Sequence, residues 1–141
     1  NIMTLHEIIL ARYLERYTEA QPLSLEVDCN FTGSGSDQPE VFTETADDDV
    51  IIVGASFHSN SGNAQTALAR ITDTGRGYVF NSRFMPIPAF AGLSNQVSPV
   101  LAFPVPWLLT RQSKLQLQLK NSASSPIGAE AKIVFHAIRV R

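Results

Sequence analysis

Apolar and polar residues alternate one by one in several long stretches of this sequence. The alternating stretches cover 23–31, 115–119 and 131–137. Successive side chains of a β-strand point to opposite faces, so this pattern is typical of strands with one buried and one solvated face. A chain with several such runs must build at least one sheet that packs against something.

Other segments extend the β pattern. The run Val50–Phe57 is almost wholly apolar, which predicts a central strand covered on both faces. Segments 64–72 and 78–80 flank the turn-rich stretch 73–77, which predicts a hairpin. In all we expect about seven to nine short strands, which favours an all-β sandwich or barrel over an α/β fold.

The N-terminal segment follows a helical period instead. Thr4 and Glu7 fit a capping box, and we expect a helix over Leu5–Tyr17. The apolar stripe of this helix comprises Leu5, Ile8, Ile9 and Tyr13. Pro22 separates the two periods, which predicts a helical arm over 1–22 and a β-sandwich domain over 23–141.

A proline-rich apolar segment lies between Met85 and Pro106. Prolines cannot donate to a sheet ladder, which confines this segment to edges, strand ends and extended connections. Together with the helix it offers surfaces for a partner. The sequence leaves open which of these surfaces meets a partner, which meets a sister subunit and which is core.

Composition excludes several classes of function. The chain has 141 residues and a net charge of −2, and its basic residues cluster only at the C-terminus, so we expect no nucleic-acid partner. Its apolar runs fall short of the ~18 residues of a membrane helix, so we expect no membrane partner. Cys29 is the single cysteine, and its place on an alternating run predicts a buried thiol.

Catalytic and metal-binding patterns are weak. His6, His58 and His136 lack the spacing of a metal-binding helix face, and Gly33–Gly35 lacks the apolar helix that follows a nucleophile elbow. Asp47–Asp49 offers oxygen ligands for calcium, but solvated acids that discourage edge pairing are the favoured interpretation. We expect no enzyme activity, no cofactor and no metal. The glycosylation acceptor pattern at 30–32 is short enough to occur by chance.

Carbohydrate binding is the main alternative function. Exposed aromatic rings on β-sandwiches can stack on sugars, and Trp107 and Tyr78 are the candidate platforms. Both lie in apolar neighbourhoods, which favours core packing for them.

Several segments of the chain resemble the small jelly-roll cementing or decoration proteins of tailed-phage capsids. The segments that carry the resemblance are 49–54, 84–88, 103–109, 115–121 and 132–137. The resemblance implies a jelly-roll-like β-sandwich with one N-terminal α-helix. It also implies a structural virion protein, made in the host bacterial cytoplasm, that binds the outer capsid surface as a homodimer and cements neighbouring major capsid subunits. A phage tail or fibre component is an alternative that shares these hydrophobic patterns.

The residues expected at protein interfaces come from the helix and the proline-rich segment. They are Leu5, Ile8, Ile9, Tyr13, Phe84, Pro86, Pro88 and Phe90.

Overall fold

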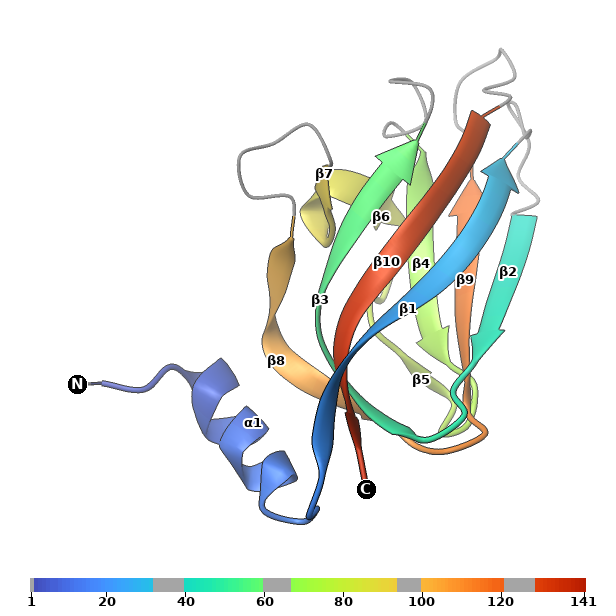
Figure 1. The fold of residues 1–141 in the computed structure, drawn as a ribbon. Coiled ribbons are helices and arrows are strands. Elements are labelled where there is room, and N and C mark those ends of the chain that lie inside the picture. Colours follow the sequence, from blue (N-terminus) through green and yellow to red (C-terminus); the bar gives the residue numbers. More distant parts are fainter. Residues whose placement is uncertain (1, 32–39, 60–66, 94–99, 121–128) are drawn as a thin grey trace.

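A computed structural model describes residues 2–31, 40–59, 67–93, 100–120 and 129–141. It shows two five-stranded sheets packed face to face, with one α-helix at the N-terminal end (Figure 1). The expected loop at 33–39, the polar connection at 121–128 and most of the polar turn at 58–63 lie outside the described residues, as does the Cys29 side chain. The acceptor pattern at 30–32 also falls there in part.

The first sheet contains β1 (Ala20–Phe31), β10 (Ala129–Val140), β3 (Asp49–Ser59), β8 (Leu101–Leu109) and β7 (Gly92–Leu93). The second sheet contains β2 (Glu40–Thr45), β9 (Lys114–Lys120), β4 (Leu68–Asp73), β5 (Tyr78–Val79) and β6 (Met85–Pro86). The helix α1 spans Leu5–Leu14, and a 3-10 turn spans Ile87–Ala89.

The order of strands identifies the fold. In the first sheet, β10 lies between β1 and β3, and both β8 and β7 pair with β3. In the second sheet, β9 lies between β2 and β4, and both β5 and β6 pair with β4. All of these pairs are antiparallel except β3 with β7. The chain crosses between the sheets at successive long strands, which is the arrangement of a jelly roll. The predicted jelly-roll-like β-sandwich with one N-terminal helix is confirmed.

The main core lies between the two sheets. The alternating residues of β9 show why it forms: Leu115, Leu117 and Leu119 are at most 1% exposed, while the glutamines between them remain half-buried. The first sheet contributes Ile52, Ile133 and Phe135 from its inner face, each fully buried. The period-2 pattern in the sequence therefore marks the inner faces of the sandwich.

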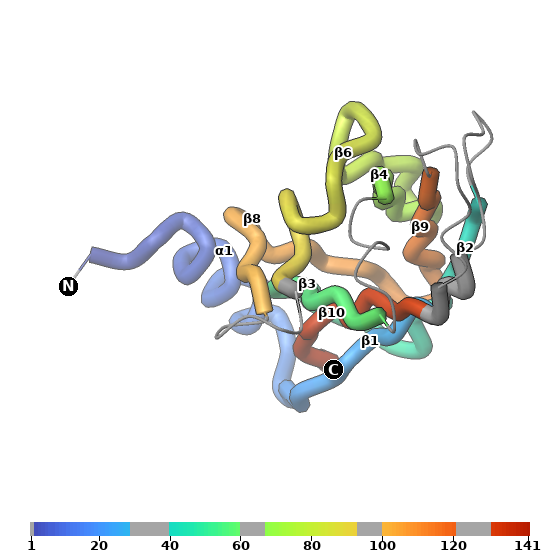
Figure 2. Tube along the Cα trace, turned by 90° about the horizontal axis from the view of Figure 1, so that it is seen from above, coloured from blue at the N-terminus to red at the C-terminus, as the bar shows by residue number. Residues whose placement is uncertain are grey.

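A second, smaller cluster lies on the outer face of the first sheet. Ile51, Leu108 and Val140 are at most 6% exposed, although they do not face the core between the sheets. The residues of α1 and the turn after it that pack against them are Leu10, Tyr13, Leu14 and Tyr17. Figure 2 shows α1 outside the sandwich, next to β8. The expectation that β3 is covered on both faces is confirmed.

The N-terminal boundaries differ from those expected. The helix ends at Leu14, three residues early, because the backbone turns so that Thr18 N and Glu19 N can donate to Arg141 O. β1 then begins at Ala20 and includes Pro22, which pairs with Ile138. β1 is an edge strand, so a proline there costs the sheet no ladder bond on its open side.

β8 is also an edge strand, as its prolines predict. It pairs with β3 at Leu101 and Ala102, and again from Trp107 to Leu109, with the register shifted between the two stretches. Gly54 lies at that shift, and a Cβ atom there would stand 2.7 Å from Leu101 O. Glycine at this position therefore lets the two strands approach each other.

Candidate functional site

Two sides of α1 carry apolar residues, and they have different surroundings. The start of the helix is capped as the sequence indicates: Thr4 Oγ1 accepts from Glu7 N at 3.2 Å. The Glu7 carboxylate accepts from the Thr4 hydroxyl at 3.3 Å, in place of the reciprocal backbone bond of a full capping box. Residues three and four apart share a helix face, so the two apolar sides can be followed separately along the helix.

The inward side of α1 is fixed to the protein's own sheet. Leu10, Tyr13 and Leu14 pack on the outer-face cluster, and the His6 Nδ1 atom lies 2.5 Å from the Phe103 carbonyl oxygen of β8. Below the helix, Tyr17 Oη donates to Asp49 Oδ2 at 3.1 Å. Desolvation, followed by this bond to Asp49, raises the pKa of Tyr17 above its ordinary value. The helix is therefore held by packing and by polar contacts at both ends.

The outward side of α1 has no partner in the described part of the chain. Leu5 is 60% exposed and Ile8 is 37% exposed, and both Ile2 and Met3 before them are at least half exposed. Val100, just before the adjacent β8, and Leu101 and Val105 on β8 are between 38% and 41% exposed, and Val105 also lines the aromatic groove described below. We call this set the α1–β8 surface; its members are Ile2, Met3, Leu5, Ile8, Val100, Leu101 and Val105.

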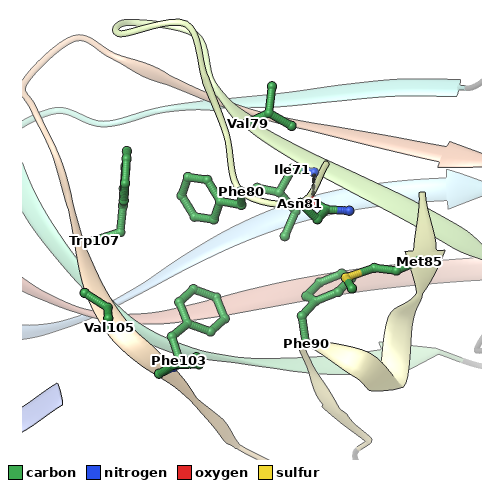
Figure 3. Close-up of a pocket in the computed structure, with 10 residues that line it drawn as sticks. Ile71, Val79, Phe80, Asn81, Met85, Phe90, Phe103, Val105 and Trp107 are labelled. Atoms are coloured by element: carbon green, nitrogen blue, oxygen red, sulfur yellow. Dashed lines mark hydrogen bonds between the residues drawn. The ribbon is translucent and has the colours of Figure 1, made fainter. Parts of the chain in front are cut away.

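A groove opens between β8 and the edge of the second sheet (Figure 3). It has a volume of about 320 Å³ and an aromatic lining that includes Phe80, Phe90, Phe103 and Trp107. Asn81 fixes the segment after β5, because its amide nitrogen donates to Ala69 O and Arg83 O and its oxygen accepts from Ile71 N. The groove can bury a small apolar group.

Trp107 is the best-anchored ring in this groove. Its Nε1 atom donates to Asp73 Oδ2 at 3.0 Å, and Asp73 Oδ1 accepts from Gly75 N at 3.0 Å, so both oxygens of this fully buried carboxylate are bonded. Phe80 packs on the ring with centroids 4.9 Å apart, and Arg76 lies 5.8 Å from the ring centroid. Tyr78 meets it edge-on at 5.7 Å and is itself 55% exposed.

The expected interface residues fall into different environments. Leu5 and Ile8 belong to the α1–β8 surface, Ile9 is half-buried, and Tyr13 packs on the outer-face cluster. Phe90 lines the aromatic groove. The other three lie near β6: Pro86 and Pro88 are exposed, and Phe84 is half-buried with Lys120 Nζ 5.5 Å from its ring centroid. The structure thus does not bring all eight residues together on one face.

The acidic run before β3 has structural contacts. Asp48 Oδ2 lies 3.2 Å from Arg141 Nη2 and 4.0 Å from Arg139 Nε. Asp49 accepts from Tyr17 through one oxygen and from Arg111 N through the other, at 2.8 Å. These carboxylates tie the start of β3 to its neighbours, a role that sequence reasoning missed because the partners are far apart in the chain.

Two of the three histidines meet on the outer face of the first sheet. Ser56 Oγ lies 2.9 Å from His58 Nε2 and 3.0 Å from His136 Nε2. Spacing along the sequence cannot show this pair, because His58 and His136 come together only where β10 pairs with β3 in the sheet. His6 lies elsewhere, on α1. Among the described residues there is no group of three or more His, Cys, Asp or Glu side chains placed to hold a metal ion.

No protein-family model matches this sequence, and no curated protein matches it. A solved structure with a similar course of the chain is the infectious bursal disease virus VP2 subviral particle. It has a TM-score of 0.39 and 15% sequence identity, and the match covers 86% of this chain. The match covers 32% of that chain, so this protein spans about a third of its length. In the described part of the chain, no helix has the length and apolarity needed to span a bilayer.

Proposed function

We propose that this protein is a structural virion component of a tailed phage, which binds the outside of the icosahedral capsid and cements neighbouring major capsid subunits. The observation that carries the proposal is the α1–β8 surface, a set of exposed apolar residues on two elements that contact each other, the helix α1 and the edge strand β8. Leu5 and Ile8 are three residues apart and so share one side of α1, and exposed apolar patches on a folded domain mark interaction sites. The jelly-roll topology and the sequence resemblance of segments 49–54, 84–88 and 103–109 support a capsid context.

The chemistry of this surface suits a protein partner. Besides its apolar side chains, Glu7 and Arg12 of α1 and Arg16 just after the helix are exposed. An apolar centre with a polar rim is the usual anatomy of a protein interface. A shell presents many copies of the same site, so a dimer of this protein would gain affinity from binding two subunits at once.

Carbohydrate binding is a second candidate, favoured by the exposed Tyr78 ring at the mouth of the aromatic groove. Against it, Trp107 is already packed by Phe80, Tyr78 and Arg76, which occupy the ring surroundings that a stacked sugar would need. The capsid role is therefore the better supported of the two.

Co-sedimentation with purified phage shells tests the proposal. The wild-type protein should travel with shells and raise their resistance to heat, and Leu5→Glu should lose this binding while keeping the melting temperature of the isolated protein. Val41→Glu is the matched control, because Val41 is 50% exposed on β2, in the other sheet. It should bind shells like the wild type.

Three results would reject the capsid role. One is binding to purified tails or fibres in place of shells. Another is saturable binding to a glycan panel that depends on Tyr78 or Trp107, with no binding to shells. The third is shell binding by Leu5→Glu equal to that of the wild type.

A further inference from the structure

The outer face of the first sheet holds a polar cluster that the proposed function does not use. Ser56 and His58 lie two residues apart on β3, so their side chains share one face of the sheet. His136 lies on β10, where it pairs with Gly54, two residues before Ser56. The sheet register therefore brings both imidazole rings to the same serine from opposite directions along the strands.

The hydrogen bonds show how the two rings are aimed. Each Nε2 atom lies within 3.0 Å of Ser56 Oγ. Ser56 is only 1% exposed, whereas both histidines are half-buried. One hydroxyl has a single proton, so in the neutral cluster it donates to one ring and accepts from the N–H of the other. Both Nε2 atoms thus point at the same hydroxyl group on the outer face of the sheet, and both rings are partly exposed.

The charge around the cluster permits a cation. Lys132 pairs with His58 across the strands, but its Nζ atom lies 3.6 Å from Glu26 Oε2 and 4.0 Å from Asp28 Oδ1. The positive charge of Lys132 is therefore paired with carboxylates rather than left free beside the rings.

Against the expectation from sequence spacing that no metal binds, we propose that Ser56, His58 and His136 form a binding site for a divalent transition-metal ion, with the two Nε2 atoms as ligands. Imidazole nitrogen suits zinc, copper and nickel. Ser56 acts as a positioning residue that aims the rings, and water completes the coordination. A site with only two protein ligands leaves positions open, unlike the closed four-ligand sites of structural zinc.

Calorimetric titration with NiCl₂ and ZnCl₂ at pH 7.5 tests the site, using tag-free full-length protein. The Cys29→Ser background removes the competing thiol. We expect one metal ion per chain, loss of saturable binding in His58→Ala and in His136→Ala, and a rise in melting temperature with metal that these variants lack. His6→Ala is the matched control and should bind like its parent.

A spectroscopic measurement identifies the ligands directly. The electron paramagnetic resonance spectrum of the protein with one equivalent of Cu²⁺ should show coupling to two nitrogen atoms, and should lose it in His136→Ala. Any of three results would overturn the proposal: the parent protein shows no saturable binding, both single variants retain binding, or His6→Ala loses binding. Circular dichroism of each variant confirms that it is folded, so that lost binding reports on the site. None of these measurements involves phage shells, so they are independent of the capsid role.

Discussion

The two sheets of this sandwich differ in how many of their faces are buried. In the second sheet, β9 buries only its leucines, and Gln116 and Gln118 remain half-buried on the other side. In the first sheet, β3 buries Ile52 toward the core and Ile51 under α1. The helix α1 is therefore part of the architecture of the first sheet, because without it an apolar patch around Ile51 would face water.

The largest expected effect comes from the core that the two sheets share. Phe135 is fully buried on the inner face of β10. Phe135→Ala should lower the free energy of unfolding by about 3–5 kcal/mol, since it removes a large ring and leaves a cavity. Val41→Ala, at an exposed position of β2, should change it by no more than about 0.5 kcal/mol. Urea denaturation measures both, and similar values for the two variants would contradict this assignment of the core.

A second, smaller effect separates the outer face from the core. Ile51→Ala should cost about 2 kcal/mol or more in the full chain, because Ile51 is fully buried. In a protein lacking residues 2–17 the same substitution should cost about 1 kcal/mol or less, since the site is then already open to water and additivity fails for groups in contact. Equal costs in the two backgrounds would show that α1 does not cover Ile51 in solution.

Sequence reasoning predicted the second sheet better than the surroundings of the first. The alternation at Leu115, Leu117 and Leu119 and the continuous apolarity of 50–57 were sufficient for the class of fold and for a strand covered twice. These patterns could not show which side of α1 covers β3. Apolar residues occur nearly all round α1, and the expected stripe of Leu5, Ile8, Ile9 and Tyr13 is divided by the packing. Leu5 and Ile8 are exposed, whereas Tyr13 packs on the sheet together with Leu10 and Leu14.

The polar contacts could not be predicted for a related reason. Asp49 meets Tyr17, and His136 meets Ser56, only because strands distant in sequence are adjacent in the sheets. Strand pairing of this kind depends on the global topology of the fold, which single-strand periodicity does not contain. The same reason explains why residues expected to share one interface, such as Leu5 and Phe90, lie in different surroundings.

A smaller effect concerns the polar contact beneath α1. Tyr17→Phe removes the hydrogen bond to Asp49 and should lower the free energy of unfolding by about 1 kcal/mol at pH 7. The pKa of Tyr17 is raised in the folded protein, so the folded state holds this proton more tightly than the unfolded state does. Stability should therefore fall as the pH rises through about 10, the ordinary pKa of tyrosine.

Denaturation series between pH 8 and 11 on the wild type and on Tyr17→Phe measure this dependence. The wild type should lose stability more steeply than the variant above pH 10. Parallel curves would show that the contact between Tyr17 and Asp49 does not persist in solution.

Hydrogen–deuterium exchange with and without bound shells tests whether the α1–β8 surface is the site of attachment, because it locates the contact on the molecule. Shell binding should slow amide exchange in α1 and at Leu101, Ala102, Phe103 and Val105 of β8. Amides of β2, on the edge of the other sheet, should exchange at unchanged rates. Slowing confined to β2 and β9, with α1 and β8 unaffected, would contradict the α1–β8 surface as the site of attachment.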